Sequence, residues 1–254
     1  MQLDRKIIKF LVTEDKVLNY NYQYALMQEM YKLMAMVDKT RAQRVHNIGF
    51  EVDNKKYKLF NFHVYFEGAK YARGGIEIKQ GSIVKLTISG VNQVLNLLFK
   101  GILKAGELKV DNCKLTLKSV DDDKKFRFSK IMLYKVRNPI VETTFNPKTK
   151  KAEFLNPCDM RYYEALGKNL LRKYEAIYNK KYEGELFFEI EDFCKIKQKF
   201  IKDINKDGFV IGFTNFELYI QADADMQKVA YNCGLGQNNS IGMGNISYIC
   251  GRNE

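Results

Sequence analysis

Strand-like and helix-like segments alternate along this chain, and the same order occurs twice. In the first half, the apolar patterning predicts strands at 3–12, 56–66 and 82–89, a final strand or two at 106–120, and helices at 20–37 and 91–103. The second half repeats this order, with strands predicted at 126–136, 185–193, 209–222 and 245–250, and helices at 159–179 and 223–233. Strand–helix–strand–strand–helix–strand is the order of a ferredoxin-like unit. The sequence therefore predicts an α+β protein with two tandem ferredoxin-like domains side by side.

The boundary between the two units is predicted at the charged run DDDKK, residues 121–125. A length of 254 residues suits one large domain or two small ones. We therefore expect an N-terminal domain at 1–122 and a C-terminal domain at 123–254. The halves share no evident sequence identity, so the repeat is one of architecture.

Two of the predicted helices carry apolar stripes at helical spacing. In the first helix the stripe joins Tyr20, Tyr24, Met27, Tyr31 and Met34. The helix at 159–179 has Asp159 placed as its cap, and Lys168, Arg172 and Lys173 fall outside the stripe formed by Tyr163, Leu166, Leu170, Tyr174 and Ile177. Both stripes are predicted to face the core.

The chain carries an excess of positive charge. Lys and Arg number 42 and Asp and Glu number 30, which gives a formal net charge of +12. An excess of this size favours a polyanionic partner, with nucleic acid first. A lysine-rich, solvated surface is the alternative.

Composition argues against several other classes of protein. No apolar run approaches the ~18–20 residues of a membrane span, and the first residues lack the apolar block of a signal peptide. The five cysteines are scattered without CxxC spacing, which suggests neither a zinc site nor a disulfide framework. We expect a cytoplasmic protein with no membrane contact, no cofactor and no metal site.

A glycine-rich segment, GLGQNNSIGMG, lies at 234–244. Its four glycines follow the pattern G-x-G-x5-G-x-G and are Gly234, Gly236, Gly242 and Gly244. Glycine allows positive φ and close backbone approach, so successive N–H groups can surround an anion. The segment is neither a P-loop nor a dinucleotide-binding fingerprint, because no GK[ST] follows and it comes after a helix. A tight turn before the last strand is the alternative interpretation.

This loop, with the preceding FTNFELYIQADADMQKVAYNC, resembles the signature of the CRISPR repeat-RNA endoribonucleases, the sixth Cas family. Other segments match the family in order: LNYNYQYALMQEMYKLM, RVHNIGF with KKYKLFNFHVYF, NPIVETTF, and RYYEALGKNLLRKYEAIY. The resemblance implies a tandem ferredoxin-like fold of the RNA-recognition type. It also implies metal-independent cutting of the repeat in a CRISPR precursor transcript. Repeat RNA is then the expected partner, and the family also admits a CRISPR effector complex or a homodimer.

Such cutting uses the 2′-OH of the RNA itself, which attacks the adjacent phosphate and leaves a 2′,3′-cyclic phosphate and a 5′-OH. A histidine can perform either of the proton transfers that this reaction needs. His46, in the polar segment RVHNIGF, matches the catalytic histidine of the family, and a plain surface histidine is the alternative. His63 alternates within an apparent strand and is predicted to be a sheet residue.

The resemblance also implies two assistants for His46. Some family members have a catalytic tyrosine in the first helix, which corresponds here to Tyr31, although its stripe also reads as core. A lysine after the histidine would stabilise charge on the phosphate. The candidates are Lys55, Lys56 and Lys58, and Lys56 is preferred. The spacing of the family is not reproduced, because Glu51, Val52 and Asp53 stand nearer to the histidine.

The remaining candidate residues would bind RNA. In the loop these are the four glycines with Gln237 and Asn238, through backbone and amide contacts. Family members often carry basic residues between the glycine pairs, where this chain has Gln237, Asn238, Asn239 and Ser240. Outside the loop, side chains that could contact phosphates are Arg41, Arg44, Lys55, Lys168, Arg172 and Lys173. A solvated helix face is the alternative for the basic residues on helices.

The leading function is thus a CRISPR precursor-RNA processing endoribonuclease. The alternative is a non-catalytic RNA-binding subunit of a CRISPR ribonucleoprotein complex, which would not need a proton-transfer group at His46. A metal-dependent nuclease is disfavoured, because the sequence has no compact Asp, Glu and His cluster and the run Asp121–Asp123 resembles a linker.

Overall fold

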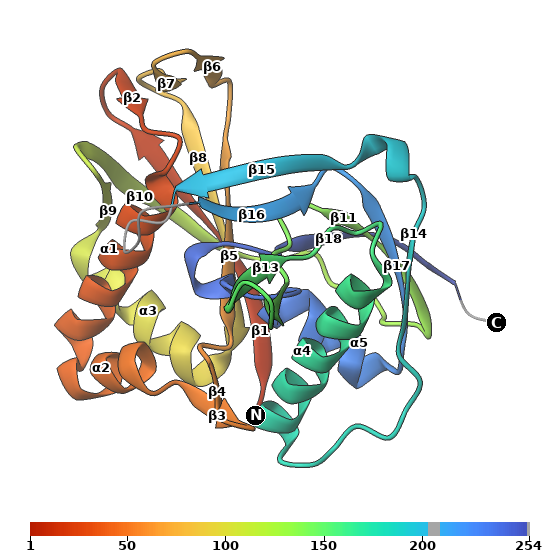
Figure 1. Ribbon diagram of the computed structural model, residues 1–254. Coiled ribbons are helices and arrows are strands. Elements are labelled where there is room, and N and C mark those ends of the chain that lie inside the picture. Colours follow the sequence, from red (N-terminus) through yellow and green to blue (C-terminus); the bar gives the residue numbers. More distant parts are fainter. Residues whose placement is uncertain (203–208, 253–254) are drawn as a thin grey trace.

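The computed structural model describes residues 1–202 and 209–252 and contains two principal antiparallel sheets (Figure 1). The first sheet has the order β5-β8-β1-β10-β9. Helices α1 and α3 pack against one another and against this sheet. The bounds are β1 Leu3–Val12, α1 Tyr22–Val37, β5 Phe60–Phe66, β8 Ile83–Val91, α3 Asn92–Ala105, β9 Glu107–Val110 and β10 Cys113–Asp122.

The second sheet lies in the C-terminal half and has the order β14-β17-β11-β18. Helices α4 and α5 pack against one another beside it, and α5 also contacts strands of the first sheet. The bounds are β11 Ile131–Val136, α4 Met160–Tyr178, β14 Phe187–Ile190, β17 Glu217–Gln221, α5 Ala224–Cys233 and β18 Ile246–Arg252.

Each sheet is ferredoxin-like. When the four core strands of each half are numbered along the chain, the second, third, first and fourth strands lie side by side in that order in both sheets. The predicted α+β class with two tandem ferredoxin-like units is confirmed. Shorter elements decorate both units: β2 Lys16–Leu18, α2 Lys39–Asn47, β3 Phe50–Val52, β4 Lys55–Tyr57, β6 Lys70–Ala72, β7 Gly75–Ile78, β12 Thr143–Asn146, β13 Lys151–Phe154, η1 Phe193–Lys195, β15 Lys197–Lys202, β16 Phe209–Thr214 and η2 Asn239–Ile241.

Three predicted segments are each interrupted by a residue with positive φ. The segment at 106–120, expected to form one strand or two, divides into β9 and β10 at Asp111, whose φ is 52°. The strand expected at 56–66 divides into β4 and β5 at Leu59, whose φ is 50°. The strand expected at 209–222 divides into β16 and β17 at Asn215, whose φ is 68°. Residues 126–130, expected to open a strand, precede β11 without pairing in a strand. Apolar alternation continues through these turns, so the pattern does not mark them.

The acidic run at 121–123 is tied to β1. Asp121 pairs with Lys9 at 3.1 Å, Asp122 pairs with Lys6, and Asp123 lies 3.2 Å from the Arg5 guanidinium. Asp121 and Asp122 are the last residues of β10 itself. These ion pairs hold the end of β10 against β1 before the chain crosses to the second unit. The composition of the run alone does not indicate this role.

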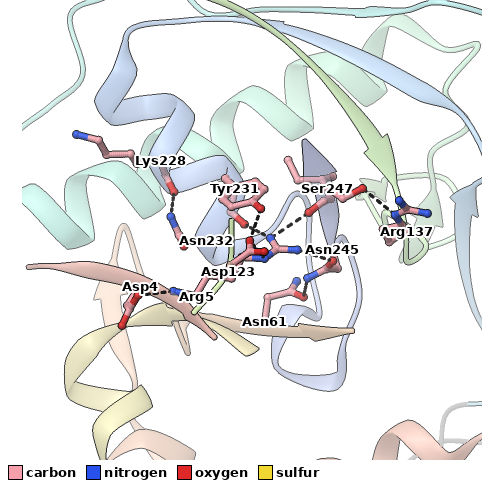
Figure 2. A network of polar contacts seen from close by, with 11 residues as sticks. Asp4, Arg5, Asn61, Asp123, Arg137, Lys228, Tyr231, Asn232, Asn245 and Ser247 are labelled. Atoms are coloured by element: carbon pink, nitrogen blue, oxygen red, sulfur yellow. Dashed lines mark hydrogen bonds and ion pairs between the residues drawn. The ribbon is translucent and has the colours of Figure 1, made fainter. Parts of the chain in front are cut away.

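Arg5 joins the two units (Figure 2). Its Nη1 donates to the carbonyl oxygens of Tyr231 and Ile246, each at 3.0 Å, and its guanidinium lies 4.1 Å from the Tyr231 ring centroid. Next to it, the Asn245 amide donates to the Asn61 side chain at 2.9 Å. Burial lowers the pKa of Arg5, and Tyr231 and Asp123 oppose that shift. These contacts tie β1 and β5 of the first unit to α5 and β18 of the second.

The predicted core stripes are rotated in the structure. On α1 the buried residues are Tyr24, Leu26, Met30, Leu33 and Met34. Tyr20 lies outside the helix and is exposed, and Met27 and Tyr31 are partly exposed. The stripe that contains Tyr31 is therefore a flank of the helix, and η2 of the C-terminal half packs against that helix.

The stripe on α4 also differs from the prediction. Tyr162 rather than Tyr163 is fully buried, and Lys173 is 2% exposed, on the same face as Leu166, Leu170 and Ile177. Asp159 caps the helix as predicted, because its carboxylate accepts a hydrogen bond from the Arg161 amide at 2.9 Å.

The β15–β16 hairpin extends from the second unit across to the first (Figure 1). Its Ile201 and Val210 join Tyr24 of α1 and Met243 in a small apolar cluster. Among the helices of the described residues, none is long and apolar enough to cross a membrane.

Candidate active site

The rings of Tyr31 and His46 meet in the space between α1 and α2. Their centroids are 4.7 Å apart and their planes are nearly perpendicular, at 88°. Tyr31 also contacts Phe60 of β5, at 6.1 Å between ring centroids. His46 is exposed, and its Nδ1 lies 2.8 Å from the Asn47 side-chain oxygen. The tyrosine thus has a packed ring, whereas the imidazole beside it is open to solvent.

His46 lies in the last turn of helix α2, so the polar segment RVHNIGF is helical as far as Asn47. The Asp38 carboxylate caps this helix by accepting from the Arg41 amide at 2.9 Å. Gly49 follows with φ of 66°, and a Cβ at this position would lie 2.4 Å from the Tyr57 carbonyl oxygen. Glycine therefore lets the chain after α2 pass close against β4.

Lys58 is the lysine that contacts the histidine segment, because its Nζ donates to the His46 carbonyl oxygen. Burial lowers the pKa of Lys58, and the positive charge of Lys56 adds to that effect. Lys55 and Lys56 lie on β4 with exposed side chains. Of the three candidate lysines, Lys58 thus lies against the segment that holds His46.

The glycine-rich loop packs against α1, which holds Tyr31, and against β5. Its four glycines all have positive φ and are buried. A Cβ on Gly244 would lie 1.8 Å from the Leu235 carbonyl oxygen, and one on Gly236 would lie 2.6 Å from the Val141 carbonyl oxygen. The glycines are therefore needed for close backbone packing, whichever ligand the loop binds.

The exposed part of the loop is its tip, residues 237–240. Ser240 lies in η2, which packs against α1, the helix that holds Tyr31. Burial raises the pKa of Tyr31 well above its ordinary value, and the interaction of its hydroxyl with the Ser240 side chain opposes that shift. The Tyr31 side chain is therefore a neutral phenol at neutral pH and can donate a hydrogen bond.

A groove of about 770 Å³ runs from this tip between β4, α4 and the β12–β13 hairpin. Its ionisable lining includes seven basic and two acidic residues: Lys55, Lys56, Lys58, Arg161, Lys168, Arg172 and Lys173, against Glu142 and Glu164. Gln237, Asn238, Asn239 and Ser240 line it as well. The groove thus joins the loop tip to a positively charged surface of a kind that suits a polyanion.

Models of one protein family match both halves of the chain. The N-terminal part of CRISPR-associated protein Cas6 matches residues 17–121, and the C-terminal part of Cas6 matches residues 121–248. The chain belongs to the Cas6 family. Residues 17–248 are thereby covered with no gap between the two matches.

Similar proteins agree with this Cas6 assignment. A curated relative from Methanocaldococcus jannaschii, CRISPR-associated endoribonuclease Cas6 1, is 28% identical over 242 residues, which cover 94% of this chain and 90% of that protein. The solved structure of a CRISPR associated protein Cas6 has a TM-score of 0.80 at 26% identity and covers 98% of this chain and 100% of that one. A structure described as an RAMP protein binding different RNA substrates has a TM-score of 0.82 at 18% identity over 97% of this chain and 100% of that one, and supports the fold alone.

The basic residues expected to contact RNA in this Cas6 chain fall into two groups. Lys55, Lys168 and Arg172 line the groove, where Arg172 pairs with Asp53 at 3.0 Å. Arg41 and Arg44 lie on α2 with exposed side chains, outside the groove lining, and Arg41 pairs with Asp38 at 3.3 Å.

Lys173 is not a phosphate contact on a solvated face, because it is buried beneath the glycine-rich loop. A signal for this was present in the sequence. Lys173 stands seven residues after Leu166 and three after Leu170, which places it within the apolar stripe of α4. A lysine in such a stripe requires buried acceptors.

His63 lies in a different hollow, of about 410 Å³, which also contains Arg5, Arg137 and Tyr248. It is a residue of β5, as predicted, and its Nδ1 lies 2.5 Å from the Asn138 side-chain oxygen. Burial lowers the pKa of His63 to about 4. At neutral pH it is an uncharged residue of the sheet.

Proposed function

We propose that this Cas6 chain is an endoribonuclease that processes CRISPR precursor RNA by cutting within the repeat, without a metal ion. The observation that carries the proposal is the contact between Tyr31 and His46. Lys58 holds the His46 carbonyl and also lines the basic groove, together with the loop tip. The name of the relative from Methanocaldococcus jannaschii, a CRISPR-associated endoribonuclease, supports the same reaction class.

In the proposed reaction the RNA 2′-OH attacks the adjacent phosphorus and the bond from phosphorus to the 5′ oxygen breaks. One proton leaves the 2′ oxygen and one reaches the 5′ oxygen, so the products are a 2′,3′-cyclic phosphate and a 5′-OH. His46 is the proposed proton-transfer residue, because its imidazole is exposed beside the Tyr31 ring. Tyr31 is held as a neutral phenol and would donate a hydrogen bond rather than act as a base.

We now prefer Lys58 to Lys56 as the cation that stabilises the developing charge on the phosphate. Lys58 is anchored on the His46 carbonyl, whereas the Lys56 side chain is exposed on β4. An anchored cation loses less by reorganisation than one on a free side chain. Lys56 would then serve with Lys55 as a phosphate contact along the groove.

The proposed RNA track follows the groove past Lys168 and Arg172 to Gln237 and Asn238 at the loop tip. Arg41 and Arg44 extend the basic surface on α2 next to His46. Of the four glycines, only Gly236 lines the groove, so RNA contact from the loop is proposed for Gly236, Gln237 and Asn238. Phosphate contacts of this kind position the RNA without reading its sequence.

Metal independence is part of the proposal, because the reaction written above needs no metal ion. Over residues 1–202 and 209–252, no group of three or more His, Cys, Asp or Glu side chains comes together in a way that could hold a metal ion. The reaction above needs proton transfer and charge stabilisation, which Tyr31, His46 and Lys58 can supply.

Other features of the proposal concern assembly and location. The division into domains at 1–122 and 123–254 remains a hypothesis, which the placement of the two sheets supports. The five cysteines are free thiols, as in proteins of a reducing compartment, and we propose a cytoplasmic location. Association with a CRISPR effector complex or a second copy of the chain follows from the family resemblance. Light scattering with and without RNA tests the homodimer.

The product ends test the reaction. End-labelled repeat RNA is incubated with the protein in excess EDTA, together with a matched RNA that carries a single 2′-deoxy nucleotide at the cut. We expect the first RNA to be cut to a 2′,3′-cyclic phosphate and the second to be bound but uncut. Tight binding without cutting of either RNA would support the alternative, a non-catalytic RNA-binding subunit. Cutting of the 2′-deoxy RNA would exclude attack by the 2′-OH.

A further inference from the structure

The three hydrogen bonds of the buried Lys173 ammonium all end on the glycine-rich loop. Its Nζ donates to the Gly234 and Gly236 carbonyl oxygens, each at 2.8 Å, and to the Asn239 side-chain oxygen at 2.6 Å. A lysine ammonium has three N–H groups, so every donor of Lys173 is used on one segment. Lys173 itself belongs to α4 and is only 2% exposed.

The third of these contacts ties the loop tip to its base. Asn239 also donates from its amide nitrogen to the Leu235 carbonyl at 3.0 Å and to the Met243 carbonyl at 2.9 Å. Its side chain thus links Lys173 with both arms of the loop. Asn239 opens the short helix η2, whose next residue is Ser240.

Ser240 connects this assembly to the active site, because η2 packs against α1 and the Tyr31 ring of α1 is packed against His46. We infer that Lys173 is a positioning residue, which fixes Asn239 so that Ser240 holds the Tyr31 hydroxyl at the site of cleavage. The inference rests on the proposed endoribonuclease function. It adds a chain of contacts that connects α4 of the second unit to the proposed reacting groups of the first.

Electrostatics fit this role. Burial lowers the pKa of Lys173 to about 8, while the nearby Cys233 and Glu142 oppose that shift. At pH 7 the side chain therefore still carries all three protons. Glu142 completes the support from the other side of the loop by accepting a hydrogen bond from the Gln237 amide at 3.1 Å.

The test separates cleavage from binding. Wild type, Lys173→Met, Asn239→Ala and Ser240→Ala are compared by single-turnover cleavage at saturating protein and by equilibrium binding of an uncleavable 2′-deoxy repeat RNA. Misplacement of a reacting group by about 1 Å can cost on the order of 100-fold in rate. We expect cleavage to fall about 10- to 100-fold in Lys173→Met and Asn239→Ala, with RNA affinity within about threefold of wild type.

The matched control is Lys180→Met, which removes the same charge from an exposed lysine just beyond α4. It should cut like wild type. Because Lys173 is buried, its variant can fail to fold, and urea unfolding is measured for each protein. Asn239→Ala keeps Lys173 in place and decides the matter if Lys173→Met does not fold.

A double variant tests the route itself. If Lys173 acts through Ser240, Lys173→Met combined with Ser240→Ala cuts within about twofold of the slower single variant. If Lys173→Met does not fold, Asn239→Ala replaces it in this pair. Rate losses that multiply, a loss of RNA affinity in place of rate, or wild-type cleavage by both Lys173→Met and Asn239→Ala would each overturn the inference. If wild type itself fails to cut, the proposed function fails instead, so the two failures can be distinguished.

Discussion

The rings of Tyr31 and His46 meet at right angles, with 4.7 Å between their centroids. Tyr31 comes from α1 and His46 from the last turn of α2, so a change of direction at Asp38 brings the two residues together. The tip of the glycine-rich loop, from the second unit, packs against α1 through η2. The proposed site therefore draws on both units, and His46, the proposed proton-transfer residue, lies in the first.

The Tyr31 hydroxyl can be removed without the ring in Tyr31→Phe. This variant keeps the packing against His46 and Phe60 but loses one hydrogen-bond donor, worth about 1.4 kcal/mol, and should cut about tenfold more slowly. Single-turnover kinetics with repeat RNA measures the change. An unchanged rate in Tyr31→Phe, together with a loss in Tyr31→Leu, would mean that only the ring matters.

Lys58 and Lys56 make a matched pair of test positions. Lys58→Ala removes the cation anchored on the His46 carbonyl and should slow cleavage on the order of 100-fold. Lys56→Ala removes an exposed charge and should mainly weaken RNA binding, with the salt dependence of the affinity reduced by about one phosphate contact. The reverse result, with cleavage lost in Lys56→Ala alone, would restore the assignment preferred from the sequence.

His63 makes the stability of the fold depend on pH. Its pKa is about 4 in the folded protein and about 6.5 in an unfolded chain, so between these values only the unfolded chain binds the proton. The free energy of unfolding should therefore fall by about 2 to 3 kcal/mol from pH 7 to pH 4.5 on account of this residue. Urea unfolding of wild type and His63→Gln at both pH values isolates the effect. Equal losses in the two proteins would refute it.

Gly244 is required by backbone packing. A Cβ there would lie 1.8 Å from the Leu235 carbonyl oxygen, and φ is 68°, so Gly244→Ala should destabilise the fold by at least about 2 kcal/mol. Gly74→Ala is the control, because nothing lies within 4 Å of a Cβ at Gly74 and its φ is not positive. Thermal unfolding that shows the two variants equally stable would contradict the packing role.

The alternation of apolar residues was enough to predict the repeated fold, because β-strands and helices bury different sequence periods. It did not predict α2, because the segment KTRAQRVHN buries only Ala42 and so has no apolar stripe. The helical position of His46 was consequently not predicted. Its contact with Tyr31 depends on how α2 returns toward α1, which local sequence does not encode.

The positions of Lys58 and Lys173 also differ from those expected from the sequence. Leu59 adopts a positive φ after Lys58, and this turn separates β4 from β5. A single strand predicted over 56–66 contains no such turn. The contact of Lys58, rather than Lys56, with the His46 segment could therefore not be predicted from it. Lys173 was placed outside the apolar face, although its spacing from Leu166 and Leu170 put it inside. The acceptors that make its burial possible lie more than 60 residues away, in the glycine-rich loop.

The central claim is that His46 performs metal-independent chemistry on repeat RNA. The most direct measurement is single-turnover cleavage of end-labelled repeat RNA in EDTA by wild type and by His46→Ala, with RNA affinity measured in parallel. We predict cutting by wild type and a loss on the order of 100- to 10,000-fold in His46→Ala at unchanged affinity, as for removal of a general acid or base. Cleavage by His46→Ala at the wild-type rate would contradict the account.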